Sequence, residues 1–303
     1  RVFVALFVFS ILAFNVNAAT YVLCTGHGDI SLKLTRNKIF INEDNNSLID
    51  WSRHIEKYTK EELEKCFKKE GINVLTYTSA KNIAHDGKQF IIDSNNGQIT
   101  SDRLLVSTGR HANTEKLNLK AVGVQVTERG EVMVDEKMQT NVEGIYAAGD
   151  CSNMPQFVYV AAAAGSRAGT NMTGGDVNLD LTTMPAVIFT DPQVATVGLT
   201  ETQANQQGIS TISRVLPMEN VPRALANFET DGFIKLVAEE STGKLIGAQI
   251  LAHEGGELVQ SVAIAIINNM TVEELAGQLF PYLTMVEGLK LCAQTFNKDV
   301  SEL

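Results

Sequence analysis

From Pro185 onward, the chain alternates apolar and polar residues in short runs that turn signals separate. A two-residue period is typical of strands that bury one face. Strands are predicted at Ala186–Thr190, Gln193–Gly198, Thr211–Pro217, Gly232–Glu239 and Lys244–Ala252. Helices are predicted at Thr200–Gln207, Glu254–Asn268, Val272–Gln278 and Met285–Thr295. Because helices follow strands on one side of the sheet, this pattern indicates an α+β domain.

Several helix starts carry the capping-box pattern, in which a Thr side chain and a Glu or Gln three residues later satisfy free backbone N–H groups. The pattern predicts capped starts at Thr59, Thr200, Thr271 and Thr284. The first of these helices runs to about Glu70 and ends at Gly71. The helix at 258–267 is almost wholly apolar, which is typical of burial on several sides and favours an oligomer interface.

The middle of the chain contains further alternating runs and tight turns. Asp-Gly and Asn-Gly pairs supply the positive φ of hairpins on either side of one run. Strands are predicted at Asn73–Thr78, at Gln89–Ser94, within a meander over Val124–Asp135, and at Gly144–Asp150. The run Arg103–Arg110 is predicted to be a buried strand that leads into a turn at Gly109. An Ala-rich helix is predicted at Tyr159–Met172, where small residues including Gly165 and Gly169 permit close packing.

The first residues differ from the rest of the chain. An unbroken apolar run from Val2 to Phe14 follows Arg1, and small residues follow the run. This pattern matches a secretory signal peptide, and the run is shorter than the ~20 residues that a transmembrane helix needs. A buried strand or helix is the alternative. Weak strand-like runs at Thr20–Leu23 and Lys38–Asn42 follow, with a turn at 26–29, and residues 20–57 receive no function.

Composition narrows the classes of function. At ~150 residues per domain, the 303 residues predict about two domains. The net charge is -10 and there is no long Lys/Arg block, which argues against nucleic acid as a partner. No stable membrane association is expected. The cysteines form no CxxC or CxxxxC pair, so each is expected to be a small buried residue or an unpaired thiol: Cys24, Cys66, Cys151 and Cys292.

Gly149-Asp150 is the clearest local signal for a ligand. A strand that ends in Gly lets the backbone approach a ligand closely, and an Asp there accepts hydrogen bonds from sugar hydroxyls. The following helix offers backbone N–H groups near Val158, which suit the electron-rich edge of a flavin. A simple turn with an Asp near a helix start explains these residues equally well.

Longer runs carry a resemblance. These are Leu104–Asn113, Thr140–Cys151, Pro155–Gly165, Asn171–Gly175, Met184–Gly198, Asn220–Phe228, Leu279–Leu291 and Ala293–Val300. Together they resemble the mercuric reductase family of flavoprotein reductases over roughly residues 60–303. The resemblance implies FAD and NADPH as cofactors, Hg(II) as the substrate and a homodimer through residues 183–303. It also implies that Gly109, Gly149, Asp150 and the backbone of Val158 bind the cofactor.

One segment separates mercuric reductases from their relatives. Disulfide reductases and dihydrolipoamide dehydrogenases of this superfamily carry a His-Pro-Thr-x-x-Glu motif whose His and Glu act as acid and base on a thiol. This chain has Phe280-Pro281-Tyr282-Leu283-Thr284-Met285, without the imidazole. The resemblance gives Tyr282 a catalytic role in transient contact with Hg(II). Without the resemblance, a core aromatic residue is the simpler interpretation, and Glu287 is interpreted as a helix cap.

The predicted fold class is α/β, a partial two-dinucleotide-domain flavoprotein reductase followed by an α+β dimerisation domain. The expected parts are a signal-like leader (1–19), an unassigned segment (20–57), a remnant of the nicotinamide-binding domain (58–110), the C-terminal part of the FAD-binding domain (111–182) and the dimerisation domain (183–303). No Gly-rich nucleotide loop or redox-active CxxxxC pair occurs in this sequence, so the chain is expected to be an incomplete and inactive portion of the enzyme.

Three alternatives stay open at this point. The chain could be a non-catalytic dimerisation module, another flavoprotein disulfide reductase such as a dihydrolipoamide dehydrogenase, or a small secreted protein of residues 1–57 joined to the enzyme portion. The leader points to export, whereas NADPH and reduced thiols point to the cytoplasm. We give the longer resemblance more weight and expect a cytoplasmic protein.

Overall fold

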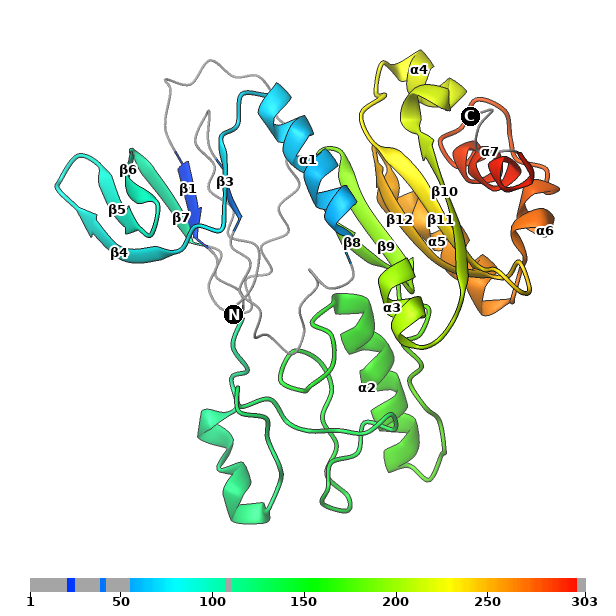
Figure 1. Ribbon diagram of the computed structural model, residues 1–303. Coiled ribbons are helices and arrows are strands. Elements are labelled where there is room, and N and C mark those ends of the chain that lie inside the picture. The colour runs from blue at the N-terminus through cyan, green and yellow to red at the C-terminus, as the bar shows by residue number, and fades with distance from the viewer. Residues whose placement is uncertain (1–20, 25–38, 42–54, 107–109, 299–303) are drawn as a thin grey trace. The chain divides into compact units, whose positions relative to one another are not determined.

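A computed structural model of the chain describes residues 21–24, 39–41, 55–106 and 110–298 (Figure 1). The leader at 1–19, the turn at 26–29 and Gly109 lie outside the described residues. The chain divides into two compact units, one formed by the segments before residue 109 and after residue 182, and the other by residues 109–182.

The largest sheet belongs to the first unit and has five antiparallel strands in the order β10-β11-β12-β9-β8. The strands are β8 (Ala186–Ile188), β9 (Gln193–Gly198), β10 (Thr211–Pro217), β11 (Phe233–Glu239) and β12 (Leu245–Ala252). Five predicted strands are therefore confirmed, two of them to the residue. The three central strands are buried along most of their length.

Helices follow these strands as predicted, with one addition. They are α3 (Glu201–Gln206), α4 (Pro222–Asn227), α5 (Gly255–Ile267), α6 (Val272–Ala276) and α7 (Glu287–Gln294), with 3-10 turns η4 (Met218–Asn220) and η5 (Thr295–Asn297). Helix α4 was not predicted. Alternate residues of β11, among them Ile234 and Leu236, join residues of α5 and α7 in one apolar core on one face of the sheet.

The other face of this sheet is covered by a helix from the beginning of the chain. Helix α1 (Lys57–Lys69) lies there, because Leu63 and Cys66 share an apolar cluster with Val194, Phe233 and Leu251 (Figure 1). The expectation that helices lie on one side of the sheet is therefore wrong. It failed because α1 and the strands that it covers are more than a hundred residues apart in the sequence.

The remaining strands of the first unit form three small sheets. The strands are β1 (Tyr21–Cys24), β2 (Ile39–Ile41), β3 (Val74–Thr76), β4 (Ala80–His85), β5 (Phe90–Ser94), β6 (Gly97–Ser101) and β7 (Arg103–Val106). Strands β4, β5 and β6 form an antiparallel meander, while β1 pairs with β7 and β2 with β3 in parallel. Strand β7 is not buried as predicted, since Val106 is exposed.

The meander confirms the turn chemistry. Gly87 and Gly97 both take positive φ, and the Asp86 carboxylate accepts hydrogen bonds from the backbone N–H groups of Lys88 and Gln89. The predicted strand at Asn73–Thr78 corresponds to β3, which pairs with β2 and stands outside the meander.

The second unit is built around α2 (Val158–Met172), with 3-10 turns η2 (Glu115–Leu117) and η3 (Leu119–Val122). Its core joins Ala164 and Ala168 of α2 to Val132 and Met138. The predicted strands at 124–135 and 144–150 are wrong, because in the described part of the chain these segments form only isolated bridges. The predicted helix is confirmed, but its alanines make the close packing. A Cβ at Gly165 or Gly169 would meet open space.

Candidate functional site

The Gly149-Asp150 turn lies in the loops that precede α2. Gly149 has a φ of +87°, in the left-handed region that favours glycine, and a Cβ built on it would lie 3.5 Å from the Cβ of Ala161. The backbone therefore passes close to α2 at this point. The Asp150 side chain is 46% exposed, so a ligand can reach its carboxylate.

Arg110 holds Asp150 in place, and sequence reasoning did not single it out. Its Nη1 donates to Oδ2 of Asp150 at 2.6 Å, and its Nη2 donates to the carbonyl oxygen of Gln156 at 2.5 Å. One guanidinium thus ties the Asp150 carboxylate to the loop that leads into α2. The pair is 40 residues apart in the sequence. The signal that could have found Arg110 is its place directly after Gly109 in the Leu104–Asn113 run.

Val158 is the first residue of α2, as the predicted flavin contact requires. The preceding residue, Phe157, makes no side-chain cap, and Val158 is 72% exposed. A helix start without a side-chain cap presents backbone N–H groups and the positive end of the helix dipole to a ligand. Gly149, Asp150 and Val158 belong to the same unit, and Arg110 links Asp150 to Gln156, two residues before Val158.

These residues fit a flavin nucleotide. The glycine turn allows close approach, the exposed carboxylate can accept from ribityl hydroxyls, and the α2 start can face the electron-rich edge of the ring. In the segment predicted to be the remnant of the nicotinamide-binding domain (58–110), strands β7 and β3 pair in parallel with β1 and β2, respectively.

Tyr282 lies in a turn before α7 and is 75% exposed. Phe280 is partly buried against the core, and Leu283 takes a φ of +63°. Thr284 Oγ1 donates to the carbonyl oxygen of Pro281 at 2.8 Å. The alternative of a core aromatic is therefore wrong for Tyr282, whose side chain faces solvent.

Glu287 stabilises this turn, although in a different way from the predicted cap. Helix α7 begins at Glu287 after Val286, so Glu287 is the first helical residue and Thr284 lies outside the helix. The buried Glu287 carboxylate accepts from the backbone N–H of Leu283 at 3.2 Å and lies 3.4 Å from Lys290 Nζ. The capping box at Thr284 is thus wrong, whereas those at Thr200 and Thr271 are confirmed.

The thiols of the described residues are single, as expected. Cys66 and Cys292 are buried, Cys151 is half-buried, and all three are free. Burial raises the pKa of the Cys66 thiol to about 11 and that of Cys292 to about 12. Within 55–106 and 110–298, no three His, Cys, Asp or Glu side chains are grouped so that they could hold a metal ion.

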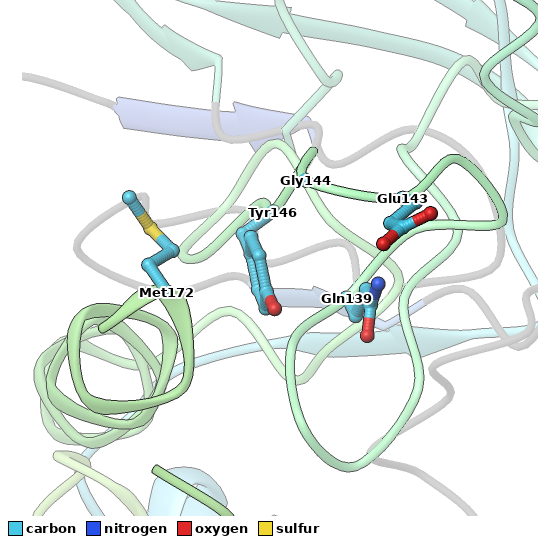
Figure 2. Close-up of a pocket in the computed structure, with 5 residues that line it drawn as sticks. All are labelled: Gln139, Glu143, Gly144, Tyr146 and Met172. Atoms are coloured by element: carbon cyan, nitrogen blue, oxygen red, sulfur yellow. The ribbon is translucent and has the colours of Figure 1, made fainter. Parts of the chain in front are cut away.

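A shallow hollow of about 480 Å³ occurs in the second unit (Figure 2). Gln139, Glu143, Gly144, Tyr146 and Met172 line it. It contains none of the predicted site residues. Separately, none of the helices in the described residues is both long and apolar enough to cross a bilayer.

Comparison with known families defines the class of the chain. Residues 22–165 match the family described as pyridine nucleotide-disulphide oxidoreductase, and residues 184–293 match the dimerisation domain of the same family. The chain belongs to the pyridine nucleotide-disulphide oxidoreductase family. The predicted class is confirmed, and with it the expectation of flavin and nicotinamide cofactors. The first match includes most of the segment 20–57, which sequence reasoning left without a function.

Individual relatives narrow the similarity. The chain is 75% identical to a mercuric reductase from Shewanella putrefaciens over 243 residues, which are 80% of the chain and 44% of that protein. It is 61% identical to a mercuric reductase from Shigella flexneri over 78% of the chain and 43% of that protein. The chain thus spans less than half the length of these relatives. The resemblance to mercuric reductases is confirmed.

Solved structures share the fold at lower identity. LpdA from Mycobacterium tuberculosis superposes with a TM-score of 0.73 at 28% identity, over 80% of this chain and 53% of that one. The Cu(II) complex of the HOCl-induced flavoprotein disulfide reductase RclA from Escherichia coli gives 0.76 at 25%, over 85% and 58%. The fold is thus shared with these proteins at low identity, and because a shared fold does not identify a substrate, the substrate must be argued from particular residues.

Proposed function

We propose that this chain provides the flavin-side and dimer-side portion of an NADPH-dependent mercury(II) reductase that uses FAD. The observation that carries the proposal is Phe280-Pro281-Tyr282, with the Tyr282 side chain exposed in the turn before α7. The identity of 75% to a mercuric reductase supports the same conclusion. NADPH and a reduced thiol pool favour the cytoplasm as the compartment.

The proposed flavin contacts involve one side chain and several backbone groups. Bound FAD would take up reducing equivalents from NADPH and deliver them to the substrate. Asp150 accepts hydrogen bonds from the sugar chain, Gly149 and Gly109 allow the backbone close to the nucleotide, and Val158 directs a backbone N–H at the ring edge. Arg110 keeps the Asp150 carboxylate in the geometry that this contact needs.

Tyr282 is proposed to contact Hg(II), the substrate, across the dimer interface. Hg(II) is a soft cation that thiolates hold, and a phenol oxygen can contact it transiently without competing strongly with sulfur. A thiol substrate needs an acid/base group, and the segment has no His for that role. Glu287 is occupied by the Leu283 N–H and Lys290, which leaves it a structural role.

The homodimer is proposed to form through residues 183–303. Helix α5 buries Leu258, Val259 and Val262 in the core, but Ile264 and Ile267 are 55% and 61% exposed. The helix was expected to be buried on several sides and to favour an oligomer interface, and its exposed flank agrees with that expectation. The exposed isoleucines form an apolar flank that a second copy can cover.

A chimera tests the proposal directly. The aligned segment of the Shewanella putrefaciens enzyme would be replaced by the 243 matching residues of this chain. We expect the chimera to bind FAD, to form a dimer and to oxidise NADPH when Hg(II) is added. NADPH oxidation driven by lipoamide or glutathione disulfide in place of Hg(II) would refute the substrate assignment. A dimeric chimera without Hg(II) turnover would favour the non-catalytic dimerisation module.

A further inference from the structure

The face of the five-stranded sheet that lies under α1 has an apolar row and a polar row. Along β11, Phe233 and Lys235 point to this face, while Ile234 and Leu236 join the core on the other. The register pairs Phe233 with Leu251 and Leu251 with Val194. The next row on the same face, two residues further along β11, pairs Lys235 with Gln249 and Gln249 with Thr196. All six side chains are buried.

Helix α1 contacts both rows. Its Leu63 and Cys66 pack on the apolar row, and the ring of Tyr58 lies 4.9 Å from that of Phe233, measured between centroids. At its C-terminal end, Lys69 forms an ion pair with Asp231. Leu63 and Cys66, three residues apart, share one helix face, so one side of α1 covers the sheet along its length.

Lys235 meets the start of α1 at the polar row. Its Nζ donates to Oε2 of Glu56 at 2.5 Å and also to Oε2 of Glu201, the first residue of α3. Glu56 occupies the N-cap position of α1, but its side chain does not bond to the backbone of the helix. The side chain extends to Lys235 instead. The backbone N–H of Glu56 donates to Oε1 of Gln249 at 3.3 Å. Two groups of Glu56 thus bind the polar row.

A lysine that is only 8% exposed is costly unless carboxylates accept from it. The two acceptors lie far apart in the sequence, and only Glu56 belongs to the start of α1. An apolar row alone would let α1 slide or rotate on the sheet, since apolar contact is not directional. A charge-assisted hydrogen bond at the helix start fixes its register.

We propose that Lys235 is a positioning residue that holds the start of α1 on the second face of the dimerisation-domain sheet. It thereby couples the chain segment that leads into β3 to the C-terminal domain. The proposal concerns the first unit alone and does not depend on the identity of the substrate.

Cys66 gives a direct measure of whether α1 is docked. Its thiol lies between α1 and the sheet, where burial raises its pKa to about 11, so it reacts slowly while the helix is in place. Cys292 is buried in the core on the opposite face of the sheet and serves as the internal reference. Alkylation of the full-length chain by iodoacetamide, followed with time by peptide mapping, reports both thiols separately.

Two substitutions remove the contact from either side. We expect Glu56→Gln and Lys235→Met each to raise the alkylation rate of Cys66 on the order of tenfold, because each breaks a charge-assisted hydrogen bond. Lys235→Arg keeps the charge and should keep the rate within about twofold of the parent. Glu61→Gln is the matched control, since Glu61 pairs with Lys57 on the exposed side of the same helix.

The rates decide between positioning and general stabilisation. The proposal is supported if Glu56→Gln and Lys235→Met raise the alkylation rate of Cys66 and leave that of Cys292 unchanged, and if Lys235→Arg reacts like the parent. An equal rise at Cys66 and Cys292 would show that Lys235 supports the whole domain, and this result would overturn the positioning role. An unchanged Cys66 rate in Glu56→Gln would overturn it as well.

Discussion

Replacing Asp150 with Asn tests the flavin assignment at its most specific residue. The substitution keeps the size of the side chain and removes the charge that receives hydrogen bonds from the sugar chain. A hydrogen bond to a charged group contributes about 1.5–3 kcal/mol. Because Asp150 is 46% exposed, solvent screening reduces this to about 1–2 kcal/mol. The expected loss of FAD affinity is about five- to thirtyfold in Kd.

Flavin fluorescence during titration of FAD into the chimera measures this Kd. Asp176→Asn is the matched control, because Asp176 carries an exposed carboxylate of the same unit and pairs with Lys137 on the surface. Its Kd should change less than twofold, as expected for an exposed pair. An unchanged Kd in Asp150→Asn, with the fold intact by circular dichroism, would show that Asp150 is a simple turn residue.

Three further outcomes are expected. Tyr282→Phe in the chimera should lower Hg(II)-dependent NADPH oxidation by roughly tenfold while FAD affinity stays the same, because only the phenol oxygen is lost. Thr271→Ala should lower the free energy of unfolding by about 1 kcal/mol in a urea titration, since it breaks the capping box of α6. The pKa of Lys235 lies above 10.5, because the hydrogen bonds and charges of Glu201 and Glu56 outweigh the lowering effect of burial. The pKa of Glu201 lies below 4.5, because its bond to Lys235 outweighs the raising effect of burial. The stability that Lys235 contributes is therefore lost as pH rises beyond 10.5, and the stability that Glu201 contributes is lost as pH falls below 4.5. In Lys235→Met, the free energy of unfolding plotted against pH should lack both of these decreases.

The C-terminal domain was predictable because its signals are local. Strands β9 and β10 begin and end where the alternation of apolar and polar residues begins and ends. The capping boxes at Thr200 and Thr271 formed because each Thr directly precedes the first helical residue. The same pattern failed at Thr59, which is buried inside α1 two residues after the helix starts. The four-residue motif cannot show where a helix begins when tertiary packing extends it.

The site was predictable only in part, for a related reason. Gly149, Asp150 and Val158 could be proposed from the sequence because they lie within one strand-like run and one helix start. Their partner Arg110 could not, since the contact depends on how loops 40 residues apart meet. Lys235 carries still less local signal, because a single Lys in an apolar strand is ordinary until its two carboxylate partners are known. Sequence periodicity reports which face is buried, and it does not report what covers that face.

The turn before α7 presents the side chain at position 282 to solvent. LpdA and RclA superpose on this chain with TM-scores of 0.73 and 0.76, and a shared backbone does not by itself identify a substrate. In this chain Glu287 accepts from the Leu283 N–H and Thr284 donates to Pro281, and these bonds hold the turn that presents Tyr282 to solvent. Glu287 therefore shapes the turn, and the exposed side chain at position 282 is the one that we propose contacts the substrate. A substitution there is expected to leave the fold intact, because the exposed phenol is not part of the apolar core of the domain.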